Sequence, residues 1–405
     1  MILRKFFKPL PLFCGYYFLI FMSGGCYSSY IPLYYSQIGL TSSQIGFIAS
    51  LSAAVTLIAQ PVWGLWGDRA STKNFVLKVS LFTTAASFWL LPLFKSPLWA
   101  FAAAVGIFTA FQCSNSPLAD AIALEVSERE RFSFSTVRTT GSVGFALVGF
   151  AAGIVFSGDS ISRIFPLFSG LVFAAFLISF FLPKVAGHQK KGERRSFFAV
   201  LKDKKLTAFY LFTLIIQGAM GMLYTFQAVF AENRGYTTRH IGVGIMIGSF
   251  SQFPFMVFFK RISNKVPLPW LLFVSALCHA ARLIIFAYFL NDYTFYFAWA
   301  LHGMCYIVFY LCLADYVAKT AEPELRSSGQ AMNALIISGV SRILGSAAGG
   351  MTAERFGMDA AFSGAGWICA AASVIFILFV SFRPAGDFKN KQEHRDGRGA
   401  EPSDQ

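Results

Sequence analysis

The chain has 405 residues, of which 56% are hydrophobic, only 13% are charged and 47 are phenylalanine. A soluble protein averages about 25% charged residues, so a soluble globule of this composition would expose a largely apolar surface. The mean hydropathy of +0.57 is typical of a helical protein that crosses a membrane many times. The same composition excludes a disordered chain, a collagen-like repeat and a small secreted domain held by disulfides.

Long apolar runs predict an all-α membrane protein. A bilayer core roughly 30 Å thick needs about 20 apolar residues per helix. We expect twelve spans, at residues 10–36, 42–66, 75–94, 97–123, 133–157, 161–182, 206–231, 238–259, 268–290, 293–317, 328–350 and 357–381. The first run has a basic flank like a signal peptide but continues through Tyr30-Ile31-Pro32, so we interpret it as a retained helix.

Basic residues predict which ends of the spans face the cytoplasm. Most Lys and Arg residues flank the N-terminus, the even-numbered breaks and the C-terminal tail, and the odd-numbered breaks hold only Lys95, Arg163, Arg234, Arg239 and Arg355. Positive loops favour the cytoplasm, which predicts an inner-membrane protein with both termini cytoplasmic. The net charge of +14 then reflects topology and anionic lipid headgroups, and we expect no nucleic-acid partner.

The second half of the chain repeats the first. Gly39-Leu-Thr-Ser-Ser-Gln-Ile-Gly46 matches Gly235-Tyr-Thr-Thr-Arg-His-Ile-Gly242 at an offset of 196 residues. Three further matches follow in order: Asp68-Arg69 with Asn264-Lys265, Leu118-Ala119-Asp120 with Leu313-Ala314-Asp315, and Arg138-x-x-Gly141-Ser142 with Arg342-x-x-Gly345-Ser346. Six spans in each half give both halves one orientation, which is the parallel repeat of major facilitator transporters.

The repeat and the charge pattern divide the chain into four parts. We expect a six-helix bundle at 1–183, a cytoplasmic linker at 184–205, a second six-helix bundle at 206–382 and a disordered cytoplasmic tail at 383–405. The linker is predicted from its run of Lys and Arg, and the tail from its polarity.

The break between the second and third spans carries a glycine-rich motif, Gly64-Leu-Trp-Gly67-Asp68-Arg69-Ala-Ser-Thr-Lys73. It resembles the loop motif of the major facilitator superfamily, G-x-x-x-D-R/K-x-G-R/K-R/K, although Ser71 and Asn74 depart from that pattern. Glycine allows close helix approach, and the aspartate can pair with a neighbouring helix in one conformation. We interpret Gly64, Asp68 and Arg69 as a conformational latch; a solvated turn is the alternative.

Asp120 and Arg138 lie nine residues on either side of position 129, the centre of the polar turn 127–131. A tight hairpin would place both side chains about 13 Å from the turn, near the bilayer midplane. Because lone charges at that depth are costly, the pattern predicts an ion pair. Transporters of this kind bind substrate at this level, and a purely structural pair is the alternative.

The motifs around this pair are Ser116-Pro-Leu-Ala-Asp120, Val126-Ser127 and Phe134-Ser-Thr-Val-Arg138-x-x-Gly141-Ser-Val-Gly144-Phe145. They resemble the lactose-permease-like proton symporters, and more nearly their phenylpropionate-permease branch. The resemblance implies that Asp120 and Arg138 bind substrate. It also implies that Arg282 and His302, in Leu301-His302-Gly303, take part in proton coupling.

Two acids of that group are absent here. Cys305 stands three residues after His302, and Gln252 or Ser249 stands where an acid is expected in the eighth span. Symport and uniport therefore both stay open, and His302 is the titratable candidate in this half. The alternative for His302 is a simple hydrogen bond to a neighbouring helix.

Arg342 repeats Arg138, but the tract 321–324 lengthens its connection to Asp315. We therefore expect Asp315 near the cytoplasmic mouth and Arg342 deep in the membrane, with the second ion pair broken. Arg342 would then meet an anionic substrate or Asp120.

These features predict a secondary active transporter that moves a small organic solute by alternating access, coupled to protons. We expect substrate to bind Asp120, Arg138, Arg282, His302 and Arg342, and the proton to bind His302, Asp120 or Arg282. Three intramembrane arginines against one acid favour an aromatic or other organic acid, and a sugar or nucleoside stays open.

The motifs of common enzyme and metal sites are missing. No phosphate loop, HExxH or nucleophile elbow occurs, and no CxxC pair joins the seven cysteines. We expect no enzyme activity, no metal and no cofactor, a proton gradient as the energy source, and a functional monomer. The alternatives are a transporter-like receptor or lipid-handling protein that moves no soluble solute, and an efflux pump for apolar compounds.

Overall fold

The computed structural model describes residues 8–156, 158–187, 204–321 and 326–381. Within them, twelve helical segments are long and apolar enough to cross a membrane, each overlapping a predicted span. The first half contains α1 Pro9–Gln37, α2 Ser42–Arg69, α3 Lys73–Ser87, α4 Leu90–Leu93, α5 Leu98–Gln112, α6 Asn115–Glu130, α7 Phe134–Val155 and α8 Ile164–Ser179.

The second half contains α9 Lys204–Asn233, α10 Thr238–Ser263, α11 Leu268–Tyr288, α12 Asp292–Ala300, α13 Phe309–Thr320, α14 Arg326–Leu335, α15 Ser341–Phe356 and α16 Met358–Ser381. Two of its spans contain a π-helical segment, Gly303–Val308 before α13 and Ile336–Val340 before α15. The predicted linker at 184–205 lies largely outside the described residues, and the predicted tail at 383–405 lies wholly outside them.

The most obvious sequence repeat corresponds to the same turn in both halves. Gly39 and Gly235 both have a positive φ, near +87° and +86°, which glycine adopts without a Cβ clash. Two residues later Thr41 and Thr237 cap α2 and α10, each in a capping box with the residue at the third helical position. The shared motif therefore encodes a turn and a helix start, which explains why it survives in both halves.

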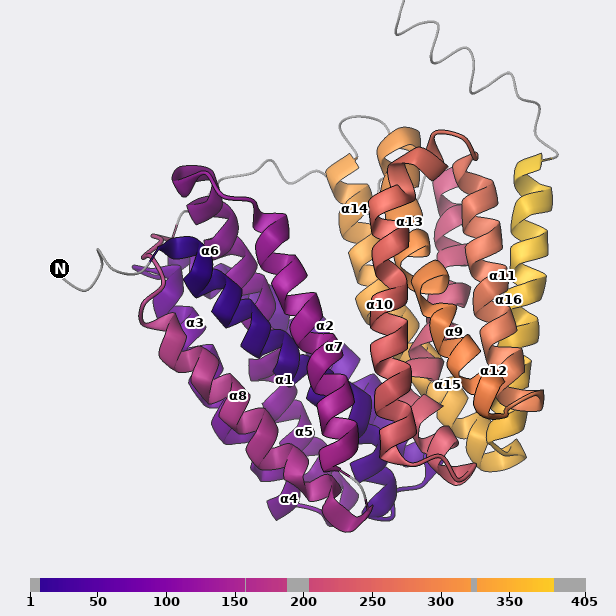
Figure 1. Ribbon diagram of the computed structural model, residues 1–405, viewed down its shortest axis with the longest axis horizontal. Coiled ribbons are helices and arrows are strands. Elements are labelled where there is room, and N and C mark those ends of the chain that lie inside the picture. The colour runs from indigo at the N-terminus through magenta and orange to yellow at the C-terminus, as the bar shows by residue number, and fades with distance from the viewer. Residues whose placement is uncertain (1–7, 157, 188–203, 322–325, 382–405) are drawn as a thin grey trace, which may run out of the picture.

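The helices form two bundles, α1–α8 and α9–α16, which meet at one end and diverge at the other (Figure 1). We call the end with the α1–α2 and α9–α10 turns the closed end, and the end with the α6–α7 turn the open end. At the closed end the Thr238 hydroxyl donates to the Gly153 carbonyl at 2.9 Å. There too the Glu354 carboxylate accepts hydrogen bonds from the Thr41 hydroxyl and the Ser43 amide, both at 2.8 Å.

Glycines allow close approach between these helices. A Cβ added to Gly144 would overlap the backbone of α1, and one added to Gly153 would overlap the backbone of α10. A Cβ on Gly350 would overlap the backbone of α2, and one on Gly345 would overlap the backbone of α9. Spans five and eleven thus carry small faces on which neighbouring helices pack tightly.

Candidate functional site

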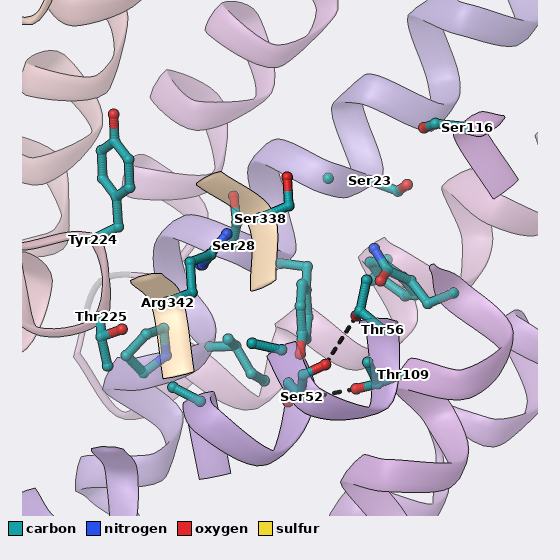
Figure 2. A pocket seen from close by; sticks show the side chains of 18 of the residues that line it. Ser23, Ser28, Ser52, Thr56, Thr109, Ser116, Tyr224, Thr225, Ser338 and Arg342 are labelled. Carbon is teal, nitrogen blue, oxygen red and sulfur yellow. Dashed lines mark hydrogen bonds between the residues drawn. The ribbon is translucent and has the colours of Figure 1, made fainter. Parts of the chain in front are cut away.

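A cavity of about 460 Å³ lies between the two bundles. Hydroxyl and amide groups from both halves line it, together with one charged side chain, Arg342 (Figure 2). These polar lining residues are Ser23, Tyr27, Ser28, Tyr35, Ser52, Thr56, Thr109, Gln112, Asn115, Ser116, Tyr224, Thr225, Ser338 and Arg342. The lining set contains no Asp or Glu, so the cavity can offer many neutral hydrogen bonds and one positive charge.

Local hydrogen bonds fix part of this polar lining. The Thr56 hydroxyl donates to the Ser52 carbonyl at 2.8 Å, and the Thr109 hydroxyl donates to the Ser52 hydroxyl at 3.5 Å (Figure 2). Aromatic rings, including Tyr27 and Phe168, cover other parts of the wall. The cavity therefore combines flat apolar faces with hydroxyl groups, a combination that suits small polar ligands.

The predicted ion pair between Asp120 and Arg138 is confirmed. Arg138 Nη1 donates to Asp120 Oδ2 at 3.0 Å and to Oδ1 at 3.2 Å, and the Tyr17 hydroxyl also donates to Oδ1. The guanidinium lies 5.2 Å from the centroid of the Phe21 ring, which lines the cavity. With Asp120 30% exposed and Arg138 45% exposed, the pair is accessible from the open end.

The turn that joins the two helices is not where the sequence placed it. The predicted turn at 127–131 is helical up to Glu130, and the chain reverses at Arg131, which has a φ of +55°. The reason is that Ser127-Glu-Arg-Glu130 contains no glycine or proline to end α6 earlier. The equal-depth argument was therefore wrong in its geometry. The two side chains meet because α6 and α7 both pack against α1, which carries Tyr17.

Arg282 lies in a different environment from Arg138. Its side chain is 0% exposed, and Nη2 donates to Gln227 Oε1 at 3.2 Å. Nη1 lies 3.2 Å from His302 Nδ1, and the guanidinium lies 5.1 Å from the Trp299 ring centroid. Among the described residues it has no carboxylate partner and does not line the cavity, so direct contact with a solute there requires a change of conformation.

The contact with Arg282 defines the state of His302. Arginine has only hydrogen-bond donors, so His302 Nδ1 accepts, and the ring is neutral in this conformation. The Tyr224 hydroxyl lies 3.5 Å from the same nitrogen, and Tyr306 stacks on the ring. Protonation at Nδ1 would bring a second positive charge against Arg282 and remove this acceptor.

Cys305 and Gln252 do not replace the missing acids with another charge. Cys305 is buried. Next to Gln252 in span eight, the Ser251 hydroxyl accepts a hydrogen bond from the Gly303 amide of span ten at 2.9 Å.

Arg342 lies at the middle of the span Ser328–Phe356 and is exposed to the cavity. It has no hydrogen bond or ion pair with any residue that the structure describes. The suggestion that it meets Asp120 is wrong for this conformation, because Asp120 is bound by Arg138 and Tyr17. The predicted loss of the second ion pair is confirmed, since Asp315 instead lies 3.7 Å from Lys319.

The predicted latch residues, Gly64, Asp68 and Arg69, lie at the open end of α2 and are exposed. Within the described parts of the chain, neither charged side chain forms an ion pair. The basic residue that does pair is Lys73, which lies 3.4 Å from Glu125. The latch role of Gly64, Asp68 and Arg69 stays a prediction for another conformation.

Sequence reasoning missed several contacts of the predicted residues. Tyr17, Gln227 and Trp299 contact Asp120 or Arg282, but nothing in a single sequence indicates which neighbouring helix faces a given charge. The π-helical segments are also invisible in sequence. One begins directly after His302 and the other ends two residues before Arg342, and such segments are frequent at functional sites.

Comparison with known proteins identifies the family. The sequence matches the model of the MFS_1 like family over residues 12–363. The chain belongs to this family. It is therefore a major facilitator transporter and not an enzyme, a multi-pass membrane protein that carries a small solute by secondary transport.

Similar proteins carry different solutes. The chain is 24% identical to the maltose permease of Geobacillus stearothermophilus over 375 residues, which cover 92% of this chain and 94% of the permease. It is also 24% identical to the putative nucleoside transporter YegT of Escherichia coli (strain K12), over 87% of this chain and 89% of YegT. The crystal structure of the nucleoside transporter NupG has the same fold, with a TM-score of 0.83 at 14% identity, covering 93% of this chain and 100% of NupG.

Proposed function

We propose that the protein is a proton symporter that brings a small hydroxylated solute, of the sugar or nucleoside class, into the cytoplasm. The observation that carries this proposal is the Asp120–Arg138 ion pair. It lies about one helical turn from the cavity residue Ser116, toward the open end, and water can reach it.

Asp120 is the proton site that the geometry favours. Its carboxylate accepts hydrogen bonds from Arg138 on α7 and from Tyr17 on α1, and the ring of a second tyrosine, Tyr16, lies 5.7 Å from that of Tyr17. A proton on Asp120 would neutralise the carboxylate and release Arg138 toward the cavity, where a solute hydroxyl could accept its hydrogen bonds. Proton binding and solute binding would then be coupled through one guanidinium.

We propose a role for His302 and Arg282 that differs from the proton binding assigned to Asp120. Because His302 Nδ1 accepts from Arg282 in this conformation, we assign proton release or stabilisation of the other conformation to this pair. Substrate contact by His302 would follow a rearrangement of the adjacent π-helical segment, Gly303–Val308.

The solute class is supported by the cavity and by the relatives. A volume of about 460 Å³ lies within the range of small-ligand sites, and serine, threonine, asparagine and glutamine side chains are suited to sugar or ribose hydroxyls. The names of the maltose permease and the putative nucleoside transporter point the same way.

The orientation follows from the charge pattern. We propose an inner-membrane location with both termini cytoplasmic, which places the open end toward the cytoplasm. We further propose the predicted bundle boundaries, 1–183 and 206–382, and a functional monomer.

The test is solute-induced proton movement in lightly buffered cells that express the protein. Addition of a transported sugar or nucleoside should make the medium more alkaline. Asp120→Asn should abolish this response, and Arg138→Gln should lower uptake, while Glu130→Gln, at an exposed position that pairs with Arg129, should behave as wild type. Solute uptake without proton movement would remove the symport claim, and unchanged uptake in both variants would leave the pair a structural role only.

A further inference from the structure

Among the residues that the structure describes, Arg342 has no hydrogen-bond or ion-pair partner, and the other groups that line its cavity are neutral. It is exposed there, at the middle of its span. Arg342 is close enough to interact electrostatically with three tyrosines, Tyr27, Tyr224 and Tyr306. None of these tyrosines carries a compensating negative charge at neutral pH.

Four acids of the described spans have other partners, whereas Asp68 and Glu128, which form no ion pair among the described residues, lie at the open ends of α2 and α6. Asp120 binds Arg138, Asp315 binds Lys319 and Glu125 binds Lys73. At the closed end Glu354 accepts from Thr41 and Ser43. Arg342 is thus left for a group that enters the cavity.

The backbone also places Arg342 in a special position. The π-helical segment Ile336–Val340 ends just before α15 begins at Ser341. A π turn changes the register of the helix that follows it, and such segments are frequent at functional sites. Figure 2 shows Arg342 among the hydroxyl-bearing residues that line the pocket.

We propose that Arg342 binds a carboxylate, so that the solute is a hydroxylated organic acid such as a sugar acid or an acidic nucleoside. This inference rests on the proposed function and narrows its solute class. A guanidinium fork matches a carboxylate with two parallel hydrogen bonds, and a single arginine matches a single negative charge better than the two charges of a phosphate.

Charge balance across the transport cycle supports the same class. An occluded cavity is poor in water, and uncompensated charge is costly at this depth. A carboxylate that enters with one proton adds no net charge to the loaded protein. A neutral solute that enters with one proton would add a second uncompensated charge to the one that Arg342 already carries.

The experiment uses two matched pairs of labelled solutes in vesicles that contain the full-length protein. Galactose is compared with galacturonate, and uridine with its carboxylated form, orotidine. Under an imposed pH gradient we expect the acid of at least one pair to enter about tenfold faster than its neutral partner, since a charged hydrogen bond is worth about one factor of ten more than a neutral one. Uptake of the acid should not respond to an imposed membrane potential.

Variants separate binding from folding. Arg342→Gln should remove the preference for the acid, Arg342→Lys should keep part of it, and Arg355→Gln, on the same helix outside the cavity, should keep all of it. The amount of each variant in the membrane is measured in parallel.

Faster or equal uptake of the neutral member, with a ratio that Arg342→Gln does not change, would overturn the inference and leave the proposed function standing. Uptake of the acid that depends on membrane potential would also overturn it. Uptake of no member of either pair would contradict both proposals.

Discussion

A single methyl group at Gly46 should shift the protein away from the conformation seen here. Gly46 lies on α2 at the closed end, where a Cβ would overlap the Ser346 carbonyl oxygen and lie 3.1 Å from the Gly350 Cα. Both neighbours are backbone atoms on α15, so they cannot rotate away. Overpacking of this kind costs about 1–3 kcal/mol.

In alternating access this interface separates when the closed end opens, and the clash of Gly46→Ala then disappears. The penalty therefore falls on one conformation only, and it should change the ratio of the two conformations by about 5- to 150-fold. Gly350→Ala, whose Cβ would overlap the Ser42 carbonyl oxygen, should act in the same direction.

The assay is the rate at which a membrane-impermeant maleimide, added from the closed-end side, labels Ile245→Cys. This residue is 4% exposed and touches Gly149 across the bundle interface. We expect Ile245→Cys to be labelled faster when Gly46→Ala is also present than when it is absent. Labelling of a parent with only the native cysteines gives the background rate. Gly170→Ala is the control, because nothing lies within 4 Å of its added Cβ. An unchanged labelling rate in Gly46→Ala would refute the reasoning.

Two further substitutions test the buried contacts. Tyr17→Phe removes a donor to the Asp120 carboxylate, and because hydrogen bonds to charged groups contribute about 1.5–3 kcal/mol, proton-driven uptake should fall about tenfold or more. Tyr16→Phe, whose hydroxyl donates to a backbone carbonyl instead, should transport normally, and equal losses in both would contradict the role of Tyr17. Gln227→Glu would give Arg282 a carboxylate, and the melting temperature in detergent should rise by about 2–4 °C. A lower melting temperature would show that the buried arginine does not need an acid.

The spans and the repeat were predictable because the bilayer imposes them locally. Each span must have a minimum apolar length, and the turns before α2 and α10 must combine a positive-φ glycine with a threonine cap. Such constraints act within a few residues, so they produce local sequence patterns that can be recognised. The lengths of polar turns are less constrained, which is why α6 continues to Glu130 beyond its predicted end.

The partners of the charged residues were only partly predictable. Asp120 and Arg138 could be paired because they lie on consecutive helices and because an isolated charge is costly there. Arg282 has no such acid, and its neutral partner Gln227 lies 55 residues away on α9. The choice of that partner depends on how helices rotate about their axes, which a single sequence does not reveal.

The two halves keep the same fold but treat their intramembrane arginines differently. In the first half the acid and the arginine remain together, Asp120 with Arg138. In the second half Asp315 binds Lys319 one turn away, and Arg342 faces the cavity with no ion-pair partner among the described residues. An arginine that is paired with an acid can bind a solute only after the acid takes a proton, whereas an arginine without such a partner can bind a solute at all times. This asymmetry gives a physical basis for separating the two proposed functions. The proton would bind Asp120 in the first bundle, and the negative charge of the solute would bind Arg342 in the second.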